Sequence, residues 1–68
     1  NDGLTVTFDG DLEMRVPAEQ RAVLRQILVQ DPRPSYQEDP ERIYGMDYAG
    51  MRIRFRVVDG CLRVCSVQ

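Results

Sequence analysis

Lysine, histidine and tryptophan are all missing from this sequence of 68 residues, and their absence restricts the chemistry that the chain can perform. Metal-free acid–base catalysis needs groups that titrate near neutral pH, and tyrosine and arginine do not titrate there unless their environment perturbs them. The sequence also has no run of about 20 apolar residues, which argues against a membrane-spanning helix, and we expect no signal peptide. These absences favour a small soluble domain without catalytic groups of its own.

Cysteine is almost as scarce, because Cys61 and Cys65 are the only two. Their spacing places both thiols on one face of a strand, too far apart along it for an easy disulfide. A metal site needs more cysteine or histidine than this chain has, so we expect no bound metal. We therefore expect reduced thiols in a cytoplasmic protein.

The basic residues are nine arginines, and they are unevenly distributed. Residues 1–51 carry five arginines and ten acidic residues, whereas residues 52–68 carry four arginines and one aspartate. The overall charge of −2 argues against non-specific nucleic-acid binding, but the basic C-terminal segment is compatible with a specific RNA partner. Arginine suits such a partner because its guanidinium makes paired hydrogen bonds to phosphate and stacks on bases.

The length of the chain limits how many domains it can form. Residues 1–68 suffice for a single small domain with a limited hydrophobic core and little room for a deep active-site cleft. The chain begins with Asn1 rather than methionine, so we expect it to be a piece of a longer protein.

The N-terminal half predicts one strand followed by one main helix. Threonine alternates with apolar residues over residues 4–8, which indicates a half-buried strand. Residues 12–16 fit either a strand or a short helical turn, and we favour the turn. From Pro17 to Gln30 no residue breaks a helix, and proline suits its first position. The apolar stripe expected to face the core consists of Val23, Leu24, Ile27 and Leu28.

The C-terminal half predicts a stiff connection and three strands. Asp31 precedes Pro32, which ends the helix, and residues 31–41 hold three of the four prolines. The predicted strands cover residues 42–48, 51–58 and 61–67. Ala49-Gly50 and Asp59-Gly60 separate them, and Asp-Gly is a strong signal for a two-residue hairpin turn. The fold class is therefore α+β, with a three-stranded antiparallel meander packed on the helix.

The two-residue turns fix the register of this meander. They place Phe55 opposite both Tyr44 and Val64, and the same counting pairs Met46 with Ile53 and Val57 with Leu62. All of these apolar residues then share one face, which is the natural partner of the helix. We expect Tyr44 and Tyr48 to pack on this core face.

The opposite face of the predicted sheet carries Arg52, Arg54, Arg56 and Arg63. Arg56 falls directly opposite Arg63, and like charges in that position are destabilising. Asp47 lies opposite Arg52 and relieves one of the four charges. An external anion would relieve the rest; the alternative is a solvated surface balanced by the acidic residues of the 38–41 segment.

The run DPRPSYQEDPERIYGMDYAGMRIRFRV, residues 31–57, resembles the hallmark of the TrmO family. These are S-adenosylmethionine-dependent enzymes that methylate N6-threonylcarbamoyladenosine next to the tRNA anticodon. The matching residues are Asp31, Pro32, Arg33, Pro34, Tyr36 and Gln37, then Arg42, Tyr44, Gly45 and Met46, then Ile53, Arg54, Phe55, Arg56 and Val57.

The resemblance implies that this chain is the small C-terminal domain of such an enzyme. An N-terminal β-barrel domain would hold the methyl donor, the parent would be a homodimer, and the tRNA anticodon region would be the partner. This chain shows no glycine-rich strand-to-helix turn for a methyl-donor site, so the fragment alone is not expected to be catalytic.

The resemblance also suggests roles for individual residues. The residues expected to bind RNA or dock the missing domain are Arg33, Tyr36, Gln37, Arg42, Arg52, Arg54, Arg56 and Arg63. The residues expected to be structural are Asp31, Pro32, Pro34, Tyr44, Gly45, Met46 and Phe55. Tyr36 is the candidate for stacking on an unpaired base. Arg33 is expected at the surface, where its replacement by alanine would change stability by less than about 0.5 kcal/mol.

The order of the elements is also similar to the shape of RelE/ParE toxins, many of which cleave ribosome-bound mRNA. The lack of lysine and histidine weakens that interpretation. Three hypotheses therefore remain open at this point: a tRNA-binding appendage of a methyltransferase, a toxin or ribonuclease, and a module used only for dimer or domain packing.

Overall fold

The computed structural model describes residues 3–33 and 39–68. In chain order its elements are β1 (Thr5–Phe8), the 3₁₀ helix η1 (Leu12–Arg15), α1 (Ala18–Val29), β2 (Tyr44–Tyr48), β3 (Met51–Val58) and β4 (Cys61–Val67). The predicted α+β class, the single main helix and the three C-terminal strands are confirmed. The short helical turn is the correct alternative for residues 12–16. Within these described ranges no helix is long and apolar enough to cross a membrane.

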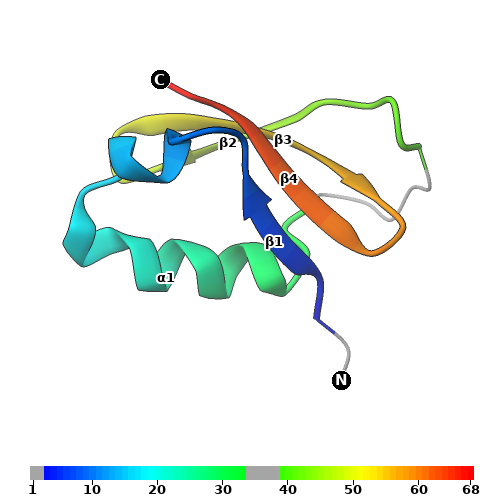
Figure 1. Cartoon of the computed structure of the whole chain (residues 1–68), viewed down its shortest axis with the longest axis horizontal. Coiled ribbons are helices and arrows are strands. Elements are labelled where there is room, and N and C mark those ends of the chain that lie inside the picture. Colours follow the sequence, from blue (N-terminus) through cyan, green and yellow to red (C-terminus); the bar gives the residue numbers. More distant parts are fainter. Residues whose placement is uncertain (1–2, 34–38) are drawn as a thin grey trace.

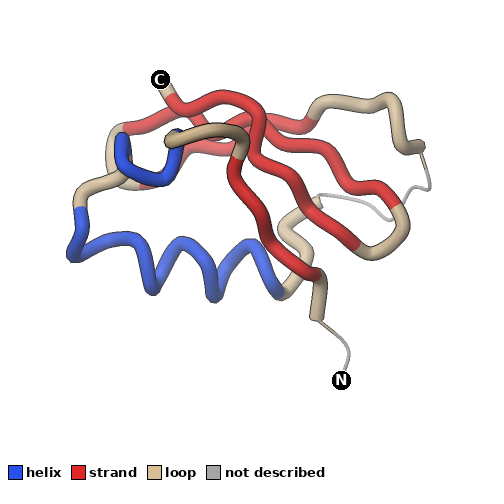
Figure 2. Tube along the Cα trace, in the orientation of Figure 1, coloured by secondary structure: helices blue, strands red, loops and turns tan. Residues whose placement is uncertain are grey.

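The strands form one mixed sheet in the order β1-β4-β3-β2. The three C-terminal strands pair antiparallel, as the meander predicts, and β1 adds to the outer side of β4 in parallel. Figures 1 and 2 show α1 lying along one side of this sheet, with η1 near the end of α1 where the helix begins. The other side of the sheet faces away from the helix.

Local backbone conformation sets both ends of α1. Pro17 has φ −53° and ψ 139°, so it is extended and stands before the helix rather than at its first position as predicted. At the other end Asp31 has a φ of 64°, and its N–H donates to the carbonyl oxygen of Leu28 at 3.1 Å. A left-handed residue at this position closes the last turn of a helix.

The register agrees with the prediction. Tyr44 pairs with Phe55 and Met46 with Ile53 across β2 and β3, while Val57 pairs with Leu62 across β3 and β4. The sequence did not predict the irregularity at Arg54/Phe55, where β4 accommodates one extra residue. Such a bulge increases the local twist of the sheet.

The core lies between the sheet and α1. Its fully buried side chains are Val16, Leu24, Leu28, Ile53, Phe55, Leu62 and Val64. The predicted helix stripe is only partly correct, because Val23 is 53% exposed. The helix is rotated so that Gln20 meets the sheet instead, where its side-chain oxygen accepts a hydrogen bond from the Tyr48 hydroxyl at 2.8 Å.

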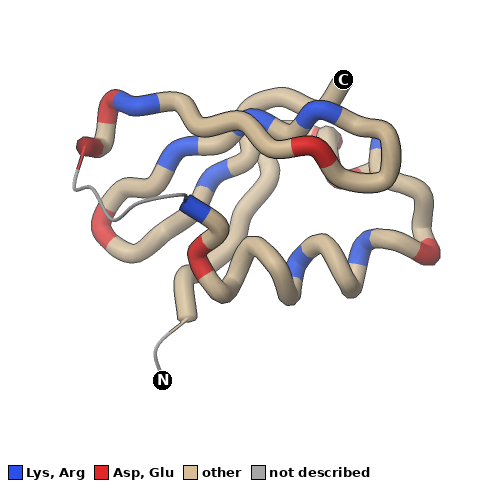
Figure 3. The backbone as a smooth tube through the Cα atoms, turned by 180° about the vertical axis from the view of Figure 1, so that it is seen from behind, with Lys and Arg blue, Asp and Glu red and all other residues tan. Residues whose placement is uncertain are grey.

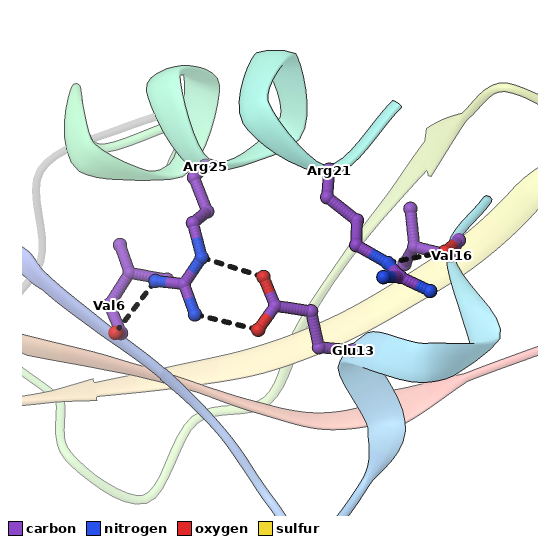
Figure 4. A network of polar contacts seen from close by, with 5 residues as sticks. All are labelled: Val6, Glu13, Val16, Arg21 and Arg25. Atoms are coloured by element: carbon purple, nitrogen blue, oxygen red, sulfur yellow. Dashed lines mark hydrogen bonds and ion pairs between the residues drawn. The ribbon is translucent and has the colours of Figure 1, made fainter. Parts of the chain in front are cut away.

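Two helix arginines occupy the space between α1, η1 and β1 (Figure 4). The Arg25 guanidinium makes two hydrogen bonds to the Glu13 carboxylate, at 2.6 and 2.8 Å, and a third to the carbonyl oxygen of Val6 at 3.3 Å. Arg21 donates to the carbonyl oxygen of Val16 at 2.8 Å. The Arg25 guanidinium also lies 5.1 Å from the centre of the Phe8 ring. Polar residues therefore cover the β1 edge of the sheet.

This ion pair predicts an acid-sensitive contribution to stability. The hydrogen bonds from Arg25 hold the pKa of Glu13 below its usual range. A lowered carboxylate pKa stabilises the fold above the unfolded pKa, and that stabilisation is lost as the pH falls through the folded pKa. We expect Glu13→Gln to lower stability by up to about 1 kcal/mol at pH 7, because the partner Arg25 is 42% exposed.

Urea denaturation between pH 7 and pH 3 measures this effect. The difference between the wild type and Glu13→Gln should shrink on acidification below the ordinary glutamate pKa of 4.5. Glu19→Gln is the matched control on the first turn of α1. A constant difference between the Glu13 variant and the wild type across this range would contradict the assignment.

Candidate nucleic-acid interface

The four arginines of β3 and β4 lie on the sheet face that points away from the helix. We call Arg52, Arg54, Arg56 and Arg63 the arginine face. Arg52, Arg54 and Arg63 are exposed, and Arg56 is half-buried. Figure 3 marks the basic and acidic positions along these strands. This placement agrees with the register predicted from the two-residue turns.

Acidic neighbours neutralise two of these arginines. The Arg52 Nε lies 2.7 Å from Asp47 Oδ1, and the Arg63 Nε lies 2.5 Å from Asp9 Oδ1. Arg54 and Arg56 have no ion pair or side-chain hydrogen bond within residues 3–33 and 39–68. Because Arg56 stands directly opposite Arg63, the face keeps an excess positive charge that an external anion can satisfy.

A hollow of about 270 Å³ opens on this face and is lined by Asp9, Arg56, Arg63 and Cys65. Asp9 was missed from the sequence, although it is the acidic residue that follows β1 directly. Once β1 is known to run parallel to β4 with Thr7 beside Arg63, the position of Asp9 follows. Asp9 then occupies part of the space that an incoming anion would use.

Most side chains around the arginines are small, although Val58 also lies on this face and is 41% exposed. Thr7 pairs with Arg63, Gly45 and Ser66 both stand beside Arg54, and Cys61 stands beside Thr5. All the described strand tyrosines and phenylalanines, in contrast, lie on the core side. A surface with guanidinium groups and no aromatic side chain from the described strands suits contacts to phosphate and ribose better than stacking on bases.

Arg33 lies elsewhere and is not exposed. Its side chain is 7% accessible, and its Nε and Nη2 donate to the two carboxylate oxygens of Asp31 at 2.7 and 2.5 Å. Hydrogen bonding from Arg33 lowers the pKa of Asp31, and the same contact raises the pKa of Arg33. The expectation of a surface arginine is therefore wrong, because the side chain folds back onto the residue that ends α1.

The motif residues of β2 gather around this pair. The buried Tyr44 hydroxyl is close enough to raise the pKa of Arg33, although it makes no hydrogen bond of ordinary geometry within the described residues. The Tyr44 ring stacks on Phe55 with centroids 5.5 Å apart, and the Arg42 guanidinium lies 5.3 Å from its centre. The two halves of the predicted motif thus meet in space, joining the end of the helix to the sheet.

The remaining motif positions divide into two groups. Met46 packs against the core, Pro32 is half-buried, and Gly45 is exposed on the arginine face side of β2. Pro34, Tyr36 and Gln37 lie outside the described residues, so their predicted roles stay predictions. Among the predicted binding residues that the structure describes, the four sheet arginines lie together on the arginine face. Arg33 and Arg42 lie apart from them, next to Tyr44.

Cys61 and Cys65 are free thiols, and both are half-buried. Cys65 lies at the bulge, where its thiol is 3.6 Å from the carbonyl oxygen of Arg54. Residues 3–33 and 39–68 contain no group of three or more His, Cys, Asp or Glu side chains that could hold a metal ion.

Comparisons with known proteins identify the family. No solved structure matches the chain. The chain is 38% identical over 52 residues to a tRNA (adenine(37)-N6)-methyltransferase of Eikenella corrodens. That match covers 76% of this chain but 30% of the relative, so the chain spans less than a third of the relative's length. The family model of the TrmO C-terminal domain matches residues 1–68, and the chain therefore belongs to this family.

Proposed function

We propose that this chain is the tRNA-binding domain of a methyltransferase that modifies N6-threonylcarbamoyladenosine beside the anticodon. The observation that carries the proposal is the presence of Arg54 and Arg56, without acidic partners among the described residues, on a sheet face bounded by small side chains. Family membership and the tRNA methyltransferase relative support tRNA as the anion. The same two findings favour a tRNA-binding domain over a toxin or ribonuclease and over a module used only for dimer or domain packing.

The proposed role is to hold the tRNA rather than to transfer the methyl group. Phosphate contacts fix the register and orientation of a nucleic acid without reading its sequence. The antiparallel pairing of β3 with β2 and β4 fixes the backbone positions of Arg54 and Arg56, which lowers the entropy cost of binding. The domain would thus present the anticodon region to a catalytic site on another part of the protein.

The methyl donor would bind outside this chain. S-adenosylmethionine carries a positive sulfonium, and the hollow on the arginine face contains two guanidinium groups and one carboxylate, which leaves an excess of one positive charge. Like charges disfavour such an occupant. The proposal therefore places the donor in a separate N-terminal domain of a cytoplasmic, homodimeric parent, and it assigns no methyl-transfer step to the residues described above.

Methylation kinetics of the full-length protein test the proposal. We expect Arg54→Gln with Arg56→Gln to raise the KM for tRNA about tenfold or more, with kcat little changed, because the variant loses binding and not chemistry. Arg15→Gln is the matched control, since Arg15 is an exposed arginine of η1 outside the arginine face. A fall in kcat at unchanged KM would contradict the proposed role.

A further inference from the structure

Gly45 is the one glycine of this chain whose presence the fold does not explain. Gly10, Gly50 and Gly60 have positive φ angles of 52°, 80° and 76°, which favour glycine. A Cβ on Gly3 would lie 2.5 Å from Val29 Cγ1, which is too close. Gly45 has neither constraint.

A side chain at Gly45 would fit. A Cβ there would meet Arg52 Nη1 at 3.5 Å, Arg52 Cδ at 3.7 Å and the Ile53 carbonyl oxygen at 4.0 Å, which are ordinary contacts. Glycine in a strand costs about 0.5–1 kcal/mol relative to alanine, because the unfolded chain is more flexible. The fold therefore bears a cost at this position that no described contact within the chain offsets.

The residues around Gly45 indicate which kind of ligand fits the space left by its missing side chain. Gly45 lies directly opposite Arg54 on the arginine face, and the Arg52 side chain runs beside it while bound to Asp47. Glycine inside a strand often marks a place where a ligand or another backbone approaches closely. The neighbouring guanidinium groups favour an anionic ligand.

The backbone of Gly45 adds a hydrogen-bond donor. Arg52 exchanges both its backbone hydrogen bonds with Gln68, at 2.8 and 3.0 Å, on the β4 side. In a strand, residues at alternate positions point their backbone N–H and C=O groups to the same side. Arg54 therefore points these groups toward β4, as Arg52 does, and away from β2. Their partners Asp47 and Gly45 then turn their own backbone groups outward. Because β2 is the last strand of the sheet that the described residues form, the Gly45 N–H faces no neighbouring strand of that sheet.

We propose that Gly45 is the point of closest approach between this domain and the ribose–phosphate backbone of its RNA. A phosphate that crosses the edge of β2 there can accept hydrogen bonds from the Gly45 N–H and from Arg54, and the missing side chain lets the ribose lie against the strand. This inference rests on the proposed function, since it places the RNA on the arginine face.

The test replaces Gly45 by alanine and by valine and measures binding of a tRNA anticodon stem-loop by fluorescence anisotropy. Valine is favoured in strands, and alanine restricts the unfolded chain more than glycine does, so we expect the melting temperature to stay the same or rise. Affinity should fall in the order wild type, alanine, valine, with a loss of about tenfold for valine. Gly50→Ala is the matched control: its positive φ predicts a lower melting temperature and an unchanged affinity of the folded protein.

The outcomes separate this inference from the proposed function. If Gly45→Val binds as tightly as the wild type while Arg54→Gln binds more weakly, the close-approach assignment is wrong and the arginine face still binds RNA. A drop of several degrees in the melting temperature of Gly45→Ala would make the glycine structural and overturn the inference. If the wild type binds no stem-loop, both proposals fail.

Discussion

Replacement of Arg33 by alanine is expected to destabilise the domain by about 2–3 kcal/mol. The Arg33 side chain is 7% exposed and makes two short hydrogen bonds to the Asp31 carboxylate. The change leaves the Asp31 carboxylate without its arginine, removes the cation beside the buried Tyr44 hydroxyl, and opens a gap next to that ring. Removing one member of a buried ion pair is costly because the other keeps its charge. Asp31 is 31% exposed, which limits the loss.

Thermal and urea denaturation measure this effect. For a domain of this size, 1 kcal/mol shifts the melting temperature by about 4–8 °C, so we expect a decrease of about 10 °C or more. Arg33→Lys should lie between the alanine variant and the wild type, because lysine keeps the charge but loses the paired geometry. Arg15→Ala, an exposed change in η1, should have little effect. A loss below about 0.5 kcal/mol for Arg33→Ala would mean that the ion pair contributes nothing to stability.

The second large effect concerns the salt dependence of RNA binding. Each phosphate contact that is lost reduces the slope of log affinity against log salt by about 0.7–0.9. Arg54→Gln with Arg56→Gln should therefore reduce the magnitude of the slope by about 1.5, and should weaken binding most at low salt. Glutamine keeps the Cβ–Cδ stem and a polar end group without the charge, so the fold should be retained.

Two further variants test whether a change in the salt slope comes from the arginine face or from net charge alone. Asp9→Asn removes the carboxylate that pairs with Arg63 and competes with an incoming phosphate, so its affinity should increase. Arg15→Gln changes the net charge by the same amount as one face variant but lies on η1. If Arg15→Gln lowers the slope as much as Arg54→Gln does, the binding is a general charge effect and not a property of the arginine face.

The sequence predicted those parts of the fold that depend on local signals. Asp59-Gly60 and Ala49-Gly50 set the two hairpins, and residue counting from these turns placed Arg56 opposite Arg63. The pairing of β1 with β4 depends on contacts that are distant in sequence, so alternation alone could not reveal it. Asp9 was missed for the same reason, because its contact with Arg63 follows from that pairing.

The errors on α1 and Arg33 have a common physical origin. Long arginine side chains combine an apolar stem with a charged end, so charge alone does not place them at the surface. Arg25 covers Phe8 and the edge of β1, and Arg33 folds back on Asp31 near the Tyr44 hydroxyl. Apolar spacing also selected Val23, which is exposed, whereas Gln20 contacts the sheet through Tyr48. Such polar contacts depend on the rotation of the helix, which periodicity determines only coarsely.

The most direct test of the central claim is an NMR titration of the isotope-labelled domain with a tRNA anticodon stem-loop. If the arginine face binds RNA, the largest shifts should appear at the backbone amides of Gly45, Arg54, Arg56 and Arg63 and at the three arginine side chains, and they should weaken as salt is raised. The amides of the exposed side of α1 around Val23 should stay unchanged. Shifts confined to α1, or no shifts at low salt, would contradict the account.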